Sequence, residues 1–275
     1  MLFLKKSISL CALLTLLVAC ASKQDKINKK QAELHFGAGT QALINRDYNS
    51  ALSNLMKANE LRPGQADVLV NLAMAYYFKG HKDLAIRSLN EALKIEPKNS
   101  DALVNLASLH YERNNFSEAE RLYKKVLEDL TYDKQARTYF NLSLIESEKK
   151  KNFSAAEKYL LLSIKENANY CPAHMKLGLL KYQQRRFTQS LDAFKDAALG
   201  TCYDDPSPHY YQGLALERLG RLGEARMKFE EVVNRFPSAP ITASARTKVI
   251  ELRNHSPELQ TSSNQLQTKL NSPEF

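Results

Sequence analysis

The chain has 275 residues, with 39 lysines and arginines against 30 aspartates and glutamates, for a formal net charge of +9. Hydrophobic residues make up 44% and charged residues 25%, a globular balance that excludes collagen-like, mostly disordered and polytopic membrane proteins. With 9 glycines and 9 prolines, tight turns are few and an all-β fold is not expected. Four cysteines are too few for a disulfide-built scaffold.

Residues 1–19 are expected to be a signal peptide. A basic pair precedes an apolar run over residues 7–18, which is shorter than the roughly 20 residues that a helix needs to cross a bilayer. The segment ends in Leu-Val-Ala-Cys, which resembles the lipobox of bacterial lipoproteins. This resemblance implies that Cys20 carries fatty acyl chains such as palmitate, and that the following Ala21 directs the protein to the outer membrane. An ordinary signal peptide with a chance cysteine is the alternative.

A repeat with a period near 34 residues follows this segment. A small residue recurs where two helices are expected to cross, at Ala51, Ala85, Ala119, Ala156, Ser190 and Ala225. Four residues later stands a large apolar one, at Leu55, Leu89, Tyr123, Leu160, Phe194 and Phe229. Proline is expected to end the second helix at Pro63, Pro97 and Pro237. Left-handed bends between the helices are expected at Gly80, Asn114 and Gly220.

These positions resemble the tetratricopeptide repeat (TPR). The resemblance implies an all-α fold, a right-handed α-solenoid of six helix-hairpin repeats over residues 32–237. We expect residues 20–31 to form the lipidated cysteine and a polar tether, residues 238–254 a C-terminal capping helix, and residues 255–275 a disordered tail. The fourth repeat has two extra residues before its first helix and one at its bend, in Lys149–Lys151, which predicts a local change of pitch.

One disulfide is predicted. Cys171 opens the first helix of repeat five and Cys202 follows the second, so both lie at the same end of one hairpin. Export to an oxidising compartment favours the bond, which would contribute roughly 3–4 kcal/mol for a loop of this length. Two buried free thiols are the alternative.

The sequence carries no pattern for catalysis or for metal binding. It has no His-Glu-x-x-His motif, no glycine-rich phosphate loop and no Gly-x-Ser-x-Gly, so we expect neither an enzyme nor a cofactor or small-molecule substrate. His35, His174 and His209 fall at a place that TPRs fill with a packing side chain. Nucleic acid is not expected as a partner, because the basic charge is diffuse and the chain is exported.

The first helix of each repeat is expected to line a concave groove, where one helical stripe is apolar and aromatic. Such a groove predicts a protein-binding site, and packing against neighbouring helices is the alternative. The stripe consists of Val70, Met74, Tyr77, Val104, Tyr111, Phe140, Leu144, Met175, Leu179, Tyr182 and Tyr210. Beside it, Asn71, Asn105 and Asn141 form either a ladder for a peptide backbone or hydrogen bonds within the helix pairs.

The signal, tether, six repeats and cap together resemble the type IV pilus pilotins, the PilF, PilW and Tgl group. The long fourth repeat, LTYDKQARTYFNLSLIESEKKKNFSAAEKYLLLSIKEN, resembles that of the family. The resemblance implies a lipoprotein of the outer membrane, facing the periplasm, that binds secretin subunits and promotes their assembly into the pilus pore. The alternative is a general periplasmic TPR scaffold lipoprotein that recruits envelope proteases or peptidoglycan enzymes.

Overall fold

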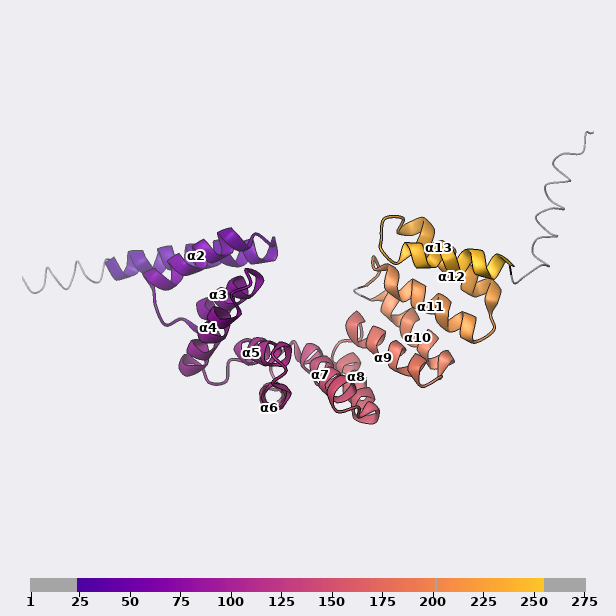
Figure 1. Cartoon of the computed structure of the whole chain (residues 1–275). Coiled ribbons are helices and arrows are strands. Elements are labelled where there is room, and N and C mark those ends of the chain that lie inside the picture. Colours follow the sequence, from indigo (N-terminus) through magenta and orange to yellow (C-terminus); the bar gives the residue numbers. More distant parts are fainter. Residues whose placement is uncertain (1–23, 201, 255–275) are drawn as a thin grey trace, which may run out of the picture. The chain divides into compact units, whose positions relative to one another are not determined.

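The computed structural model describes residues 24–200 and 202–254, which form helical hairpins joined by short turns (Figure 1). These residues include no strand, which confirms the all-α prediction. The expected signal peptide, the acylated Cys20 and the tail of residues 255–275 lie outside the described residues. The chain divides into two compact units that meet in sequence between Asp133 and Lys134.

The described part of the first unit, from residue 24 on, holds three hairpins. Its first helix covers residues 24–44, so residues 24–31, expected to be tether, are helical. The other helices of this unit are α2 (Tyr48–Leu61), α3 (Ala66–Phe78), α4 (Lys82–Ile95), α5 (Ser100–Glu112) and α6 (Phe116–Val126).

The second unit holds three more hairpins and a last helix, which occupies the place of the expected cap. Its helices are α7 (Gln135–Leu144), the π-helix η1 (Ile145–Lys149), α8 (Phe153–Glu166), α9 (Cys171–Gln183), α10 (Phe187–Leu199), α11 (Pro206–Arg218), α12 (Leu222–Arg235) and α13 (Thr242–Asn254). The cap α13 packs against α12, as the first helix of a further repeat would.

The small and large residues of the repeat form the core of every hairpin. All six small residues, from Ala51 to Ala225, are completely buried, and the large residue four places later is at most 1% exposed in each repeat. A small side chain lets two helices approach closely, and the large one fills the space beside the crossing. The spacing read from the sequence therefore identifies the core correctly.

Glycine on the first helix makes room for three of these core residues. A Cβ atom added to Gly178 would lie 2.4 Å from Phe194 Cε1, and one added to Gly213 would lie 2.6 Å from Phe229 Cε1. Gly39 has the same relation to Leu55, at 2.6 Å. At these three crossings the core side chain occupies the space that a Cβ atom would need.

Every hairpin bends through one residue in the left-handed region of backbone space. The prediction is confirmed for Gly80, Asn114 and Gly220. The other three bends carry basic residues at positive φ, which the sequence did not reveal: Arg46 (φ 60°), Lys151 (φ 55°) and Arg185 (φ 59°). A side chain in this conformation strains the backbone. The left-handed conformation of these three residues is therefore imposed by the geometry of the hairpin and not by residue preference.

The extra residue of the fourth repeat widens a helix. We expected it at the bend, but the last turn of the first helix is instead a π-helix, in which Lys150 N donates to Ile145 O at 3.1 Å. A π turn accommodates one more residue than an α turn. Lys151 consequently keeps the left-handed bend, and Ala156 and Leu160 return to their places in the core.

The helix ends follow from local chemistry. Asp47, Asn99, Asn152 and Asp205 each accept a hydrogen bond from a backbone N–H in the first turn of the helix that follows. The helices that precede Pro63, Pro97 and Pro237 each end two residues before the proline, as predicted.

Candidate functional site

A stripe of apolar and aromatic side chains follows the first helices of the second unit. Met175, Leu179 and Tyr182 belong to α9, and Tyr210 belongs to α11, where Leu214 lies one turn further along the same face. All five are half-buried and pack against a core that includes Phe194 and Phe229. Their inner surfaces stabilise the repeats while their outer surfaces remain in solvent, so the stripe offers an apolar surface of limited depth.

Charged groups surround the two tyrosines of this stripe. Burial raises the pKa of Tyr182 and of Tyr210, and the charges of Lys248 and Glu217 act on both hydroxyls. Lys248 of α13 lies 3.0 Å from a Glu217 carboxylate oxygen and 3.0 Å from a Glu251 oxygen, and these hydrogen bonds raise the pKa of Lys248. The hydroxyls therefore stay protonated at neutral pH and can donate hydrogen bonds to a partner.

Two further members of the stripe belong to α7. Phe140 is half-buried, with its ring 5.8 Å from that of Tyr170, and it packs against the core of repeats four and five. Leu144 is also half-buried and is the last residue before the π-helix. Lys176 of α9 pairs with Glu148 of the π-helix at 2.6 Å.

In the first unit the stripe is narrower and more polar. The Tyr77 hydroxyl donates to Glu112 Oε1 at 2.5 Å, and Lys82 Nζ lies 2.7 Å from Glu112 Oε2. Burial alone would raise the pKa of Glu112, but the hydrogen bonds from Lys82 and Tyr77 outweigh it and hold that pKa below its ordinary value. Met74 and Tyr111 are half-buried, and the Tyr111 ring lies 5.4 Å from the Phe116 ring.

Two residues of the predicted stripe are not available to a partner. Val104 is 1% exposed and Val70 is 7% exposed, so the assignment of these two to a binding surface is wrong. The reason is size, because Phe140, Met175 and Tyr210 stand at the equivalent place and remain half-buried. A valine at this place is too short to emerge between the flanking helices.

The three asparagines differ in their surroundings. Asn71 Nδ2 donates to Thr40 Oγ1 at 2.8 Å. This bond joins repeat one to repeat two, so it is not the hydrogen bond within one helix pair that we considered as the alternative to a peptide ladder. Asn105 and Asn141 are half-buried, and neither side chain forms a hydrogen bond with the described part of the chain. Only these last two amides are therefore open to a peptide backbone.

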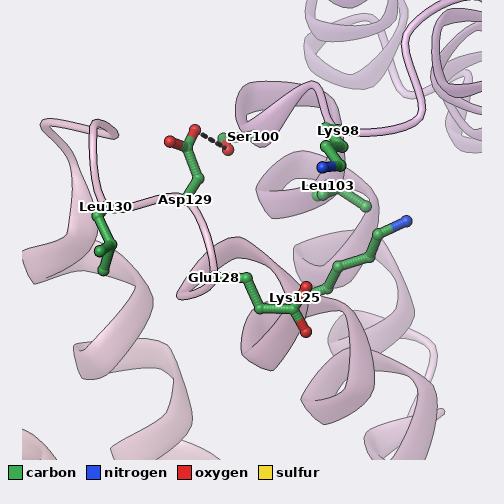
Figure 2. A pocket seen from close by; sticks show the side chains of 7 residues that line it. All are labelled: Lys98, Ser100, Leu103, Lys125, Glu128, Asp129 and Leu130. Atoms are coloured by element: carbon green, nitrogen blue, oxygen red, sulfur yellow. Dashed lines mark hydrogen bonds between the residues drawn. The ribbon is translucent and has the colours of Figure 1, made fainter.

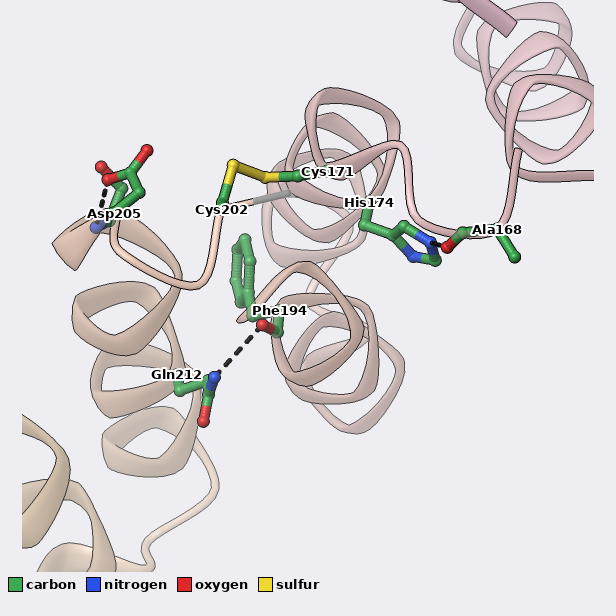
Figure 3. Close-up of a disulfide and its surroundings, with 8 residues drawn as sticks. Ala168, Cys171, His174, Phe194, Cys202, Asp205 and Gln212 are labelled. Atoms are coloured by element: carbon green, nitrogen blue, oxygen red, sulfur yellow. Dashed lines mark hydrogen bonds between the residues drawn. A yellow bond between two sulfur atoms is a disulfide. The ribbon is translucent and has the colours of Figure 1, made fainter. Parts of the chain in front are cut away.

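Cys171 and Cys202 form a disulfide with a Cα–Cα distance of 5.7 Å (Figure 3). The bond connects the start of α9 to the loop after α10, and thus closes the open end of the fifth hairpin. Nearby, Gln212 Nε2 donates to Phe194 O at 3.1 Å and ties repeat six to repeat five.

The three histidines of the repeat have packing surroundings. His174 Nε2 is 2.8 Å from Ala168 O (Figure 3), and His35 Nδ1 is 2.9 Å from Asn54 Oδ1. His209 is buried against Phe236, and burial lowers the pKa of its imidazole. Across residues 24–200 and 202–254, no cluster of three His, Cys, Asp or Glu side chains has the geometry to hold a metal ion. Within the same ranges, no helix combines the length and apolarity needed to span a membrane.

A cavity of about 470 Å³ at the end of the first unit was not anticipated (Figure 2). Ser100 Oγ donates to Asp129 Oδ2 at 2.7 Å, and hydrogen bonds from Thr131 and Ser100 hold the pKa of Asp129 below its ordinary value. The lining residues are Lys98, Ser100, Leu103, Lys125, Glu128, Asp129 and Leu130. Its only signal in the sequence is the insertion LTYDKQA, which begins at the highly exposed Leu130.

Comparisons with known proteins agree with this architecture. Residues 79–138 and residues 175–240 each match a tetratricopeptide-repeat family. PilF of Pseudomonas aeruginosa is 19% identical, with a TM-score of 0.69, and the match covers 80% of this chain and 99% of that one. PilW, a widely conserved type IV pilus biogenesis factor, is 19% identical, with a TM-score of 0.67 and coverage of 78% and 97%.

A chain of the APC/C hetero-tetramer Cut9–Hcn1 is also similar. It is 16% identical, with a TM-score of 0.65, and the match covers 81% of this chain but 43% of that one. No curated protein matches the chain in sequence. At these identities the likeness shows the fold alone.

Proposed function

We propose that this chain, which carries tetratricopeptide repeats, is an outer-membrane lipoprotein that acts as a pilotin. It would bind secretin subunits in the periplasm and promote their assembly for type IV pilus biogenesis. TPR proteins bind protein partners, which supports a role of this kind.

The observation that carries the proposal is the extent of the likeness to PilF and PilW. The similarity runs over 99% and 97% of those two chains and over 80% and 78% of this one, so it extends along nearly the whole described solenoid. The sequence adds the lipobox at Cys20, which would hold the protein and its bound partner at the membrane.

The stripe on the first helices is the surface that we assign to the partner. In the second unit it presents Met175, Leu179 and Tyr182 for apolar contact, and the tyrosine hydroxyl as a hydrogen-bond donor. In the same unit the amide of Asn141 adds a donor and an acceptor for a peptide backbone. An apolar segment of a secretin subunit bound here would be shielded from water until it enters the membrane.

A general scaffold for envelope proteases or peptidoglycan enzymes is the second candidate. The chain of the Cut9–Hcn1 assembly has a TM-score of 0.65, close to the 0.69 of PilF, so the same repeat fold occurs in an assembly of another kind. Fold by itself therefore does not select the partner.

Deletion of the gene tests the pilotin role. If the protein is a pilotin, the deletion strain loses the heat-resistant secretin multimer on denaturing gels, and it loses surface pili. A plasmid copy of the gene should restore both. Normal multimers and normal pili in the deletion strain would refute the proposal and favour the scaffold.

A second experiment tests the surface. Leu179→Glu together with Tyr182→Glu should abolish capture of the secretin subunit by the purified protein, while circular dichroism stays helical. Leu161→Glu is the matched control, because Leu161 is an exposed leucine on α8, away from the stripe. Leu179 and Tyr182 also pack against the core of the second unit, so the urea midpoint of the double variant is compared with that of the parent protein beside its helicity. Capture that survives the double substitution would show that the partner binds elsewhere.

A further inference from the structure

The outward face of the first helix, residues 24–44, is unusually apolar for a surface that nothing in the described chain covers. Residues three and four apart on a helix share a face, and one such row is Ile27, Lys30, Leu34, Gly37, Gln41 and Ile44. All six are exposed, and the three large aliphatic side chains are 41%, 65% and 69% exposed at positions 27, 34 and 44.

The opposite face of this helix is the one that the fold uses. Ala32 is 3% exposed and Gly39 is buried against Leu55 of α2. Gly37, in contrast, has no atom within 4 Å of the place where a Cβ would be. None of the three large aliphatic side chains of the outward row belongs to the core of the first unit, and a large part of each stays in solvent.

Basic side chains accompany the aliphatic ones. Lys26 and Lys30 lie on the outward side, and neither forms an ion pair with any residue of the described ranges. Aliphatic side chains with lysines on one side of a helix are the pattern of helices that lie in the interface of a membrane. The lysines attract anionic headgroups while the aliphatic groups enter the boundary of the acyl chains.

We infer that the outward face of the helix of residues 24–44 lies on the lipid bilayer, in contact with anionic headgroups. The inference rests on the proposed acylation of Cys20, which stands four residues before the start of the helix. Four residues span at most about 14 Å, so the acyl anchor keeps this helix end at the membrane surface. The face would then set how the first unit stands on the membrane, which the anchor alone does not do.

The test uses the acylated protein in vesicles of phosphatidylethanolamine and phosphatidylglycerol. An environment-sensitive dye is attached at Leu34→Cys or, as a control, at Leu161→Cys, an exposed leucine of the second unit. We expect the dye at position 34 to shift to the blue and to be quenched by a lipid-borne quencher, and the dye at position 161 to do neither. In the anchored protein, Lys26→Gln with Lys30→Gln should reduce the ratio of helices in contact with the bilayer to helices away from it by about five-fold per lysine.

Flotation of the protein with the vesicles separates this inference from the proposed function. Protein that does not float lacks the anchor, which refutes the lipoprotein proposal itself. Protein that floats while position 34 remains in water overturns the membrane-contact inference alone. Dye-to-dye quenching between copies at position 34, without lipid quenching, overturns it as well, because the face would then join two copies of the chain.

Discussion

Gly178→Ala is expected to destabilise the second unit. The added methyl would lie 2.4, 2.6 and 2.9 Å from three carbons of the Phe194 ring, whereas carbon atoms in contact are about 3.5–4.0 Å apart. Phe194 is completely buried and cannot move aside without disturbing its neighbours. Overpacking of this kind costs about 1–3 kcal/mol of unfolding free energy.

A second substitution should restore most of this loss. Repeat two carries Ala73 and Leu89 at the equivalent places, so Gly178→Ala with Phe194→Leu reproduces a pair that the fold already contains. Phe194→Leu alone should cost roughly 1–2 kcal/mol through the cavity that it leaves. The double variant should therefore be more stable than the sum of the two losses, by on the order of 1–2 kcal/mol.

The assay is urea unfolding of the purified protein, followed by circular dichroism at the helical band. Gly223→Ala is the control, because Gly223 lies on α12 with open space around it. There the added methyl should raise the free energy of unfolding by at most about 0.5 kcal/mol. The reasoning is refuted if Gly178→Ala matches the parent protein, or if the two substitutions at positions 178 and 194 are simply additive.

Three further predictions concern the bend, the disulfide and a histidine. Arg185→Gly should raise the free energy of unfolding by about 1 kcal/mol, because the left-handed bend strains any side chain, and an unchanged urea midpoint would contradict this. Cys171→Ser with Cys202→Ser should lower the free energy of unfolding by roughly 3–4 kcal/mol. Urea unfolding of this variant and of the parent protein, each with and without a reductant, checks the loss. Burial lowers the pKa of His209 below 6.5, so the neutral imidazole contributes fully to the free energy of unfolding above pH 6.5. This contribution decreases as the pH falls toward the pKa of the folded state. Urea midpoints should therefore fall on acidification through that range, less steeply in His209→Gln, and a midpoint that rises would contradict the assignment.

The periodic part of the fold follows from the sequence because packing imposes it. A small residue at each helix crossing and a large one four places later are required wherever two helices pack, so Ala51 and Leu55 are predictable from their spacing alone. The same holds for proline, which cannot continue a helix. The bends at Arg46, Lys151 and Arg185 are not predictable in this way, since residue preference argues against them and tertiary structure overrides it.

The candidate site is predictable to a smaller degree. Helical spacing places Met175, Leu179 and Tyr182 on one face, but burial depends on side-chain length against the neighbouring helices, and Val104 is hidden for that reason. The bond from Asn71 to Thr40 depends on a contact between repeats, and the cavity beside Leu130 depends on an insertion; periodicity describes neither. Residues that break the period, such as the insertion in repeat four, mark where such contacts are to be sought.

The disulfide has a consequence for how the repeats come apart. Linear arrays of hairpins fray from their ends, since each hairpin is stabilised mainly by its neighbours. The fifth hairpin is different, because the covalent bond between Cys171 and Cys202 keeps its two helices together after its neighbours have opened. It can serve as a seed on which α11 and α12 refold after the outer repeats have opened.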